Sequence, residues 1–276
     1  MPFQELFDET LDVNSTENYE LAVQISSANV AFCILDSIRN KYVLFRSFET
    51  DDTALKIDEI IRKDDFLNCK YKKATVIIVT EKSTLVPIQL YDPAKKDEYF
   101  CLNHSHENNA AILANKIADP EAYSVFEISK PIHDVITSRY PNINFVHHLK
   151  PLLNHVYRVG KSFKDDYIHL HVEKDFFNLI ILNSNSFKFC NSFNYRNIND
   201  ILYYVVNVLK NFEINQETTI HLSGLVERYD DLTSLFSDYI RRLKFSQPSG
   251  NFAFSYVFNE SVLHRYLNLF NLPNCV

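Results

Sequence analysis

Apolar residues alternate with polar ones, or run together, in three short segments near the middle of the chain, residues 168–172, 177–182 and 187–193. Because side chains along a strand point alternately to the two faces of a sheet, this pattern predicts three strands joined by tight turns. From Ile198 the period lengthens to that of a helix, behind Asn197, whose side chain can cap the first turn. The segment therefore predicts a β-meander followed by an amphipathic helix.

An earlier stretch repeats this order of elements. Residues 21–48 align with residues 168–193 once two residues are inserted in one hairpin turn, where an insertion disturbs a sheet least. An apolar stripe over 53–63 predicts the helix that follows the first meander. The match predicts an internal duplication, in which residues 19–80 superpose on 166–223 with a right-handed helix crossover in each copy. The alternative is a pair of unrelated meanders.

The same two periods predict the remaining elements. Pro87 and Pro93 interrupt the segment 84–120, which predicts an insertion in which Tyr99–Leu102 could pair as a strand. The polar residues 161–166 connect the two halves. Further strands are predicted at 74–80, 123–128, 143–147, 218–223 and 252–256, helices at 132–136, 149–157, 232–243 and 262–270, and a polar extension at 1–18.

Two lobes follow from the repeat, one over residues 1–160 with the insertion around 84–120, and one over 161–276. The chain has 276 residues, 46% of them hydrophobic and 23% charged, so each lobe can bury its own core. The net charge of −7 disfavours binding to nucleic acid or to an anionic membrane, which rests on lysine and arginine. The N-terminal segment lacks the pattern of a signal peptide, and no apolar run is long enough to span a bilayer. We therefore expect a cytoplasmic protein, whose five cysteines, without a Cys-x-x-Cys pair, are reduced.

Glycine is scarce. The chain has three glycines, where average usage would give roughly 19. Asparagine tolerates a left-handed backbone better than other residues with a side chain, so we expect positive φ angles at Asn40 and Asn185 in the hairpin turns. Asparagine cannot replace a glycine that lets backbone amides close on a phosphate.

Two copies of strand–strand–strand–helix–strand–helix resemble the duplicated ribonuclease-H-like core of the actin, sugar kinase and Hsp70 superfamily. A narrower likeness rests on Thr84-Leu85-Val86-Pro87, Tyr91-Asp92-Pro93, Leu102-Asn103, Asn191-Ser192-Phe193, Asp200, Tyr203-Tyr204 and Leu222-Ser223-Gly224. Through these residues the chain is similar to a bacterial family of unknown function with an actin-like ATPase fold. The resemblance implies an α/β fold with mixed sheets and two actin-like lobes around a cleft, and it brings no catalytic signature.

In that superfamily the turn after the first strand of each lobe holds Asp-x-Gly. Its carboxylate orients magnesium or water, and its glycine lets amides approach the phosphates of ATP. At the matching positions this chain has Gln24 and Ser26 in the first copy and His171 and Glu173 in the second. A side chain at Ser26 or Glu173 fills the space that glycine leaves open, and the Glu173 carboxylate repels a triphosphate.

The superfamily's Gly-Gly, which packs on adenosine, resembles Ser223-Gly224, with Arg228 a turn further along. We expect the following residues to line the cleft as a degenerate nucleotide site that forms no phosphate cradle: Ser26, Ser27, Asn29, Glu173, Lys174, Asp175, Ser223, Gly224 and Arg228.

Other chemistry is weakly indicated. Three histidine pairs, 104/106, 147/148 and 169/171, raise the question of a zinc or iron site, but no cysteine or carboxylate stands at ligand spacing, so we predict no metal. Neither a Gly-x-Ser-x-Gly motif nor a Gly-Lys-Ser/Thr phosphate loop is present. The basic cluster at 70–73 is typical of a solvated strand entry.

The sequence predicts a non-catalytic scaffold or partner-binding module with no cofactor, whose partner is another protein. The alternative is an ATPase or kinase-like enzyme that binds ATP and magnesium through unusual loops.

Overall fold

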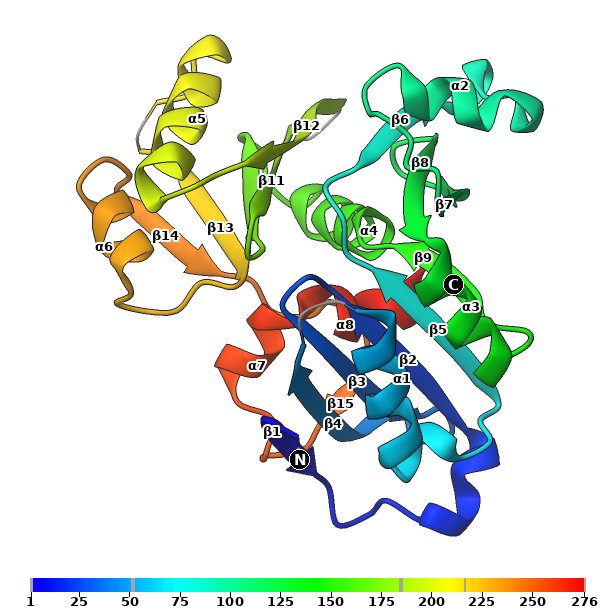
Figure 1. Cartoon of the computed structure of the whole chain (residues 1–276). Helices are drawn as coiled ribbons and strands as arrows, with labels where there is room; N and C mark the ends of the chain where they lie inside the picture. The colour runs from blue at the N-terminus through cyan, green and yellow to red at the C-terminus, as the bar shows by residue number, and fades with distance from the viewer. Residues whose placement is uncertain (1, 51–52, 184–185, 216, 276) are drawn as a thin grey trace. The chain divides into compact units, whose positions relative to one another are not determined.

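Three β-sheets and their helices make up the structure, a computed structural model that describes residues 2–50, 53–183, 186–215 and 217–275 (Figure 1). They fall into two units. Unit 1 comprises Met1–Pro151, Gly250–Phe258 and Leu272–Val276, and unit 2 comprises Leu152–Ser249 and Asn259–Asn271. The lobes over 1–160 and 161–276 remain a prediction about the two repeats.

The main sheet of unit 1 has the strand order β1-β4-β3-β2-β5-β9, with a short strand, β15, added to β4. The strands β2, β3 and β4 form the predicted antiparallel meander, and β5 and β9 run parallel to β2 and β5 respectively. The strand bounds are β1 Gln4–Phe7, β2 Tyr19–Ile25, β3 Asn29–Asp36, β4 Lys41–Glu49, β5 Lys73–Ile78, β9 Asn144–His147 and β15 Ala253–Phe254.

The prediction of a polar extension over residues 1–18 is wrong. Within this segment β1 pairs with β4, and residues Val13–Asn18 form a 3-10 helix, η1, that leads into β2. The residues of β1 alternate between half-buried and exposed, as is usual for a strand at a sheet edge. Polar and apolar residues do not alternate in step with this burial, so the sequence gives no strand period here.

Two helices, α1 (Ala54–Lys63) and α3 (Lys130–Arg139), cover one face of this sheet. Ile57 and Ile61 of α1 and Ile136 of α3 are almost completely buried against strand residues of β2 and β3. Burying one such side chain stabilises the fold by roughly 1.5–3 kcal/mol, so the apolar stripes hold the helices to the sheet. Beyond α1, Phe66–Asn68 form the 3-10 helix η2.

The insertion forms its own small sheet, with the order β6-β8-β7 (Figure 1). Its core joins side chains from all three strands to Phe100 of the helix α2. The expected strand at Tyr99–Leu102 is therefore wrong, since Tyr99 and Phe100 lie on a helix whose first turn carries two acidic residues that favour a helix N-terminus. The bounds are β6 Ser83–Pro87, η3 Ile88–Leu90, η4 Pro93–Lys95, α2 Lys96–Cys101, β7 Ala110–Ile117 and β8 Ala122–Ser129.

The sheet of unit 2 has the order β12-β11-β10-β13-β14. Each strand has a counterpart in the same position of β4-β3-β2-β5-β9 in unit 1, so the two sheets share one strand order. In both sheets three antiparallel strands are followed by strands that pair in parallel. This shared topology is consistent with the predicted duplication. The bounds are β10 Tyr167–Val172, β11 Phe176–Asn183, β12 Ser186–Asn194, β13 Thr219–Gly224 and β14 Arg242–Phe245.

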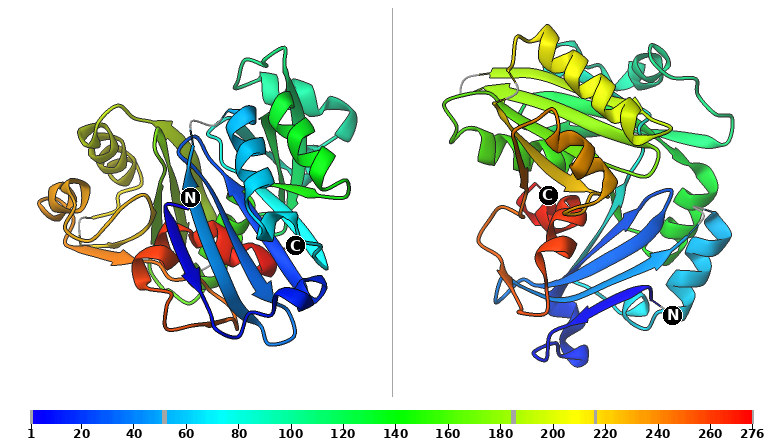
Figure 2. Two further views of the ribbon diagram at one scale, coloured as in Figure 1. Left: turned by 60° about the horizontal axis from the view of Figure 1, so that its bottom comes forward. Right: turned by 90° about the vertical axis from the view of Figure 1, so that its left-hand side faces the viewer.

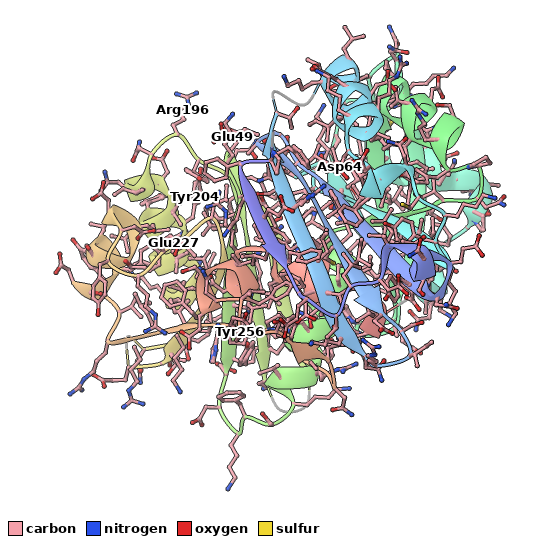
Figure 3. All side chains as sticks on the ribbon, turned by 90° about the horizontal axis from the view of Figure 1, so that it is seen from below. Glu49, Asp64, Arg196, Tyr204, Glu227 and Tyr256 are labelled. Carbon is pink, nitrogen blue, oxygen red and sulfur yellow. The ribbon has the colours of Figure 1, made fainter. Side chains whose placement is uncertain are left out.

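Two helices of unit 2, α5 (Ile198–Asn211) and α6 (Asp231–Ser237), pack on Ile168, Leu170 and Val172 from one face of the sheet (Figure 2). The predicted cap of α5 is confirmed, because Asn197 Oδ1 accepts hydrogen bonds from the amides of Asn199 and Asp200. Tyr204, labelled in Figure 3, stacks from α5 on Phe193 of β12 with ring centres 5.0 Å apart.

The opposite face of that sheet is covered within unit 2 by α4 and α8, whose side chains meet those of β10. The helix predicted at 262–270 is two short helices, and the helix predicted at 232–243 ends at Ser237, so that Leu243 lies on a strand, β14, instead. The bounds are α4 Leu149–Gly160, α7 Glu260–Arg265, α8 Leu267–Asn271 and η5 Leu272–Asn274. No helix among the described residues is long and apolar enough to cross a membrane.

The account of scarce glycine is confirmed at Asn40, which has a φ of 51° in the turn between β3 and β4. Asn185, the matching residue of the second meander, lies outside the described residues.

Candidate functional site

The first candidate turn, between β2 and β3 of unit 1, is closed by its own serine. Ser26 is 3% exposed, and its Oγ accepts hydrogen bonds from the amides of Ala28 (3.3 Å) and Asn29 (3.1 Å). The same hydroxyl donates to the Asn29 carbonyl at 3.2 Å. Two amides that a glycine-containing turn could present to a phosphate therefore already have a partner.

Two buried acceptors flank this turn. The side-chain oxygens Gln24 Oε1 and Asn29 Oδ1 are buried without a hydrogen-bond partner among the described residues. A buried acceptor without a donor is costly, so each oxygen favours a group that can donate a hydrogen bond. Phosphate oxygens at neutral pH are mainly acceptors, and these two atoms do not favour them.

The second candidate turn, between β10 and β11 of unit 2, holds a carboxylate in place of glycine. Glu173 is 5% exposed, and its amide donates to the Phe176 carbonyl at 2.8 Å. Its carboxylate lies 3.1 Å from His171 Nε2, and the Tyr195 hydroxyl donates to its carbonyl oxygen at 2.6 Å. These contacts fix Glu173 inside the turn, while Lys174 and the next residue, Asp175, are exposed.

A chain of hydrogen bonds runs from Glu173 into the interior of unit 2. Ser223 Oγ lies 2.7 Å from His171 Nδ1 and 2.8 Å from His169 Nε2, so the hydroxyl donates to one imidazole and accepts from the other. The side-chain amide of Asn268 on α8 lies 3.0 Å from His171 Nε2. Burial, and then the neighbouring His155 and other histidines, holds the pKa of His169 well below its ordinary value, so His169 is neutral at pH 7.

Sequence patterns placed His169 and His171 on a polar sheet face, yet both are almost completely buried. The pairing of β10 with β13 sets His171 beside Ser223, and α4 and α8 cover this layer. Local periodicity cannot show the contacts of His171 with Ser223 and Asn268, because Ser223 is more than 50 residues away along the chain and Asn268 is more than 90 residues away. The sequence signal that could have indicated this buried cluster is the alternation of His169 and His171 with apolar residues in one strand.

Gly224 is required by the packing of two strands. It has a φ of +86°, and a Cβ at this position would lie 2.0 Å from the carbonyl oxygen of Val172 on β10. The amide of the next residue, Leu225, donates to that same oxygen at 2.7 Å. The close approach of the two strands therefore explains why position 224 is glycine, without any role for a nucleotide.

Arg228 lies on the surface of unit 2. Its guanidinium forms an ion pair with Glu260 at 2.9 Å and lies 5.7 Å from the ring centre of Phe245. The structure thus places Glu173, which directly follows β10, near Ser223 and Gly224 of the neighbouring strand β13, with Lys174 and Asp175 on the same turn as Glu173. It places Ser26, Ser27 and Asn29 together on the turn of unit 1.

The other histidine pairs serve local structure. His104 Nε2 lies 3.0 Å from the Ser83 carbonyl, and His106 Nδ1 lies 2.6 Å from the Glu127 carboxylate. His147 contacts the hydroxyl of Ser124 at 3.0 Å. Within the part of the chain that the structure describes, no group of three or more histidine, cysteine or acidic side chains is arranged to hold a metal ion.

The two larger sheets share one strand order, and the chain has the actin-like ATPase fold. More narrowly, the chain belongs to the family described as "Protein of unknown function (DUF3822)", whose model matches residues 8–243. No curated protein matches the chain.

Three solved structures support this fold. A Bacteroides thetaiotaomicron protein with an actin-like ATPase fold and unknown function superposes with a TM-score of 0.79 at 21% identity, covering 86% of this chain and 94% of that one. The PilM–PilN type IV pilus biogenesis complex gives 0.57 at 12% identity, with coverages of 93% and 98%. The ethanolamine utilization protein EutJ from Carboxydothermus hydrogenoformans gives 0.54 at 8% identity, with coverages of 96% and 94%. At these identities the similarity shows the fold alone.

Proposed function

We propose that this protein is a non-catalytic member of the actin-like fold that acts as a scaffold or partner-binding module, with another protein as its partner. The observation that carries the proposal is the pair of occupied turns. Ser26 satisfies the amides of its own turn, and Glu173 places a buried carboxylate in the other. Both features oppose the binding of a triphosphate, one by removing donors and one by charge.

A protein partner is consistent with one structural relative. PilM, in a structure of similar fold, is found in a complex with PilN. None of the five cysteines, all of them described by the structure, forms a disulfide bond, which fits the reducing conditions of the cytoplasm, where we expect the protein to act.

An ATP-binding enzyme is the second candidate function. The unpartnered oxygens of Gln24 and Asn29 favour it, because water molecules around a magnesium ion could donate hydrogen bonds to them. The exposed ammonium group of Lys174 could also contact a phosphate.

Calorimetry of the full chain with ATP and Mg²⁺ separates the two candidates. The scaffold proposal predicts no heat of binding at ATP concentrations up to the millimolar range. Micromolar binding, accompanied by changes in the amide NMR signals of Ala28 and Asn29, would overturn it and support the enzyme.

A further inference from the structure

Unit 2 contains a cavity of about 830 Å³ at the end of its sheet where β10, β13 and β14 begin. The turn that holds Glu173 and the close approach at Gly224 lie at the other end of these strands, after β10 and β13 finish. Pockets for small molecules in proteins commonly have volumes of about 300–1,000 Å³. The cavity is therefore large enough for a metabolite and is separate from the degenerate turn of the same unit.

The floor of this cavity includes His221 of β13, a buried side chain whose ring nitrogens have no hydrogen-bond partner among the described residues. The residue is 8% exposed, its ring stacks on Tyr167 at 4.3 Å, and Phe163 meets it edge-on at 5.4 Å. No hydrogen bond from the described residues reaches either ring nitrogen, and the ring lines the cavity. Burial, and then the nearby Lys244, lowers the pKa of His221 to about 4, so the neutral ring offers one donor and one acceptor.

Two cations stand beside His221. In the parallel pairing of β13 with β14, His221 is opposite Lys244 and Thr219 is opposite Arg242, so these side chains share one face of the sheet. Both cations are exposed and line the cavity, together with Lys164. None of the three forms an ion pair with a described residue.

Half of the acidic groups in the lining are already neutralised. Asp166 pairs with Lys188 at 2.6 Å, and Glu217 pairs with Arg241 at 2.6 Å, and neither of these cations lines the cavity. Asp165 and Glu213 have no ion pair among the described residues. The charges left for a ligand are those of three cations and two carboxylates, which match a ligand that carries both signs.

We propose that this cavity binds a small zwitterion, such as a phosphorylated or dicarboxylic amino acid. Its carboxylate or phosphate oxygens accept hydrogen bonds from Arg242 and Lys244, His221 hydrogen-bonds the same end of the ligand, and its ammonium group faces Asp165 and Glu213. Phosphate and dicarboxylate ligands share this chemistry, so both are used as probes.

Calorimetry of the full chain with O-phosphoserine and, separately, with glutamate tests the proposal, with inorganic phosphate and ethylammonium as single-charge controls. We expect at least one zwitterion to bind, about tenfold or more tightly than either control, with a change in the imidazole NMR signals of His221. Binding of inorganic phosphate as tight as that of both zwitterions, or no change at His221 with any probe, would overturn it.

Three variants at exposed positions locate the binding without disturbing the core. Arg242→Ala and Lys244→Ala should each weaken binding about tenfold, because each removes a charge-assisted hydrogen bond. Arg196→Ala is the matched control, since it removes the same charge from an exposed side chain of unit 2 that lines no part of the cavity. It should change the affinity less than about twofold. Equal weakening by Arg196→Ala would show general surface electrostatics and refute the site.

Discussion

At the scale of single residues, the two altered turns block phosphate in different ways. Ser26 uses its hydroxyl to satisfy neighbouring amides, so its effect is on hydrogen bonding. Glu173 is held by His171 and by the Tyr195 hydroxyl, so its effect is a fixed negative charge. Replacing either residue with glycine should remove its effect without adding a new side chain.

The double variant Ser26→Gly with Glu173→Gly should create or strengthen ATP binding. It frees two amides in one turn and removes a carboxylate from the other, and each change favours an anion. Calorimetry with ATP and Mg²⁺ measures the effect, with Ser26→Ala as a variant that removes the hydroxyl but keeps a side chain. If the wild-type protein already binds ATP and the double variant binds it no better, the occlusion hypothesis fails.

Gly224→Ala should destabilise the protein by about 3 kcal/mol or more, because a Cβ would meet the Val172 carbonyl at 2.0 Å and because φ is +86°. Urea denaturation gives the change in the free energy of unfolding. Gly160→Ala is the control. Its Cβ would lie 3.0 Å from a flexible Leu182 methyl group, and we expect a change within about 1 kcal/mol. An equal effect of both substitutions would argue against the backbone contact.

At the scale of elements, sequence periodicity predicted both meanders and their following helices, since these carry long apolar patterns of a single period. It missed β14, because Leu243 also fits the helical stripe that begins at Leu232, and only pairing with β13 makes it a strand. The short aromatic segment at Tyr99 and Phe100 also fits either period, so its pattern predicts a strand where the structure has a helix. The candidate turns could be located from the repeat, but the partners of Ser26 and Glu173 could not.

The capping box of α5 should contribute measurably to stability. Asn197→Ala removes an acceptor for two amides of the first turn and should lower the free energy of unfolding by about 1 kcal/mol. Asn199→Ala, in the same exposed turn, should leave stability unchanged or raise it by a few tenths of a kcal/mol, because alanine is the better helix former. Urea titration of both variants checks this, and equal loss in both would contradict the assigned cap.

At the scale of the whole molecule, buried histidines should make stability depend on pH. Burial is the main cause that lowers the pKa of His155 to about 3 and the pKa values of His147 and His221 to about 4, from an ordinary value of 6.5. Below pH 6.5 the unfolded chain binds protons that these folded histidines do not, so stability falls as the pH drops from 6.5 towards about 4. Each histidine contributes at most about 1.4 kcal/mol per pH unit.

Urea midpoints at pH 7.5, 6.5 and 5.5 measure this dependence. His155→Gln should reduce the slope below pH 6.5, because glutamine takes up no proton in the unfolded chain. Asn199→Ala, which removes no titratable group, should keep the slope of the wild-type protein. Stability that is constant from pH 7.5 to 5.5 would contradict a neutral, buried histidine layer.

The path of the chain after residue 249 has a consequence for biosynthesis. Residues 250–258 and 272–276 belong to unit 1, although 259–271 belong to unit 2. A ribosome makes the chain in order, so β15, which pairs with β4, and Asn268, which contacts His171, are both made after the rest of their units. Neither unit can therefore complete its native contacts before residues 250–276 are made and have left the ribosome. Nascent chains stalled at residue 249 should be digested by protease in both units.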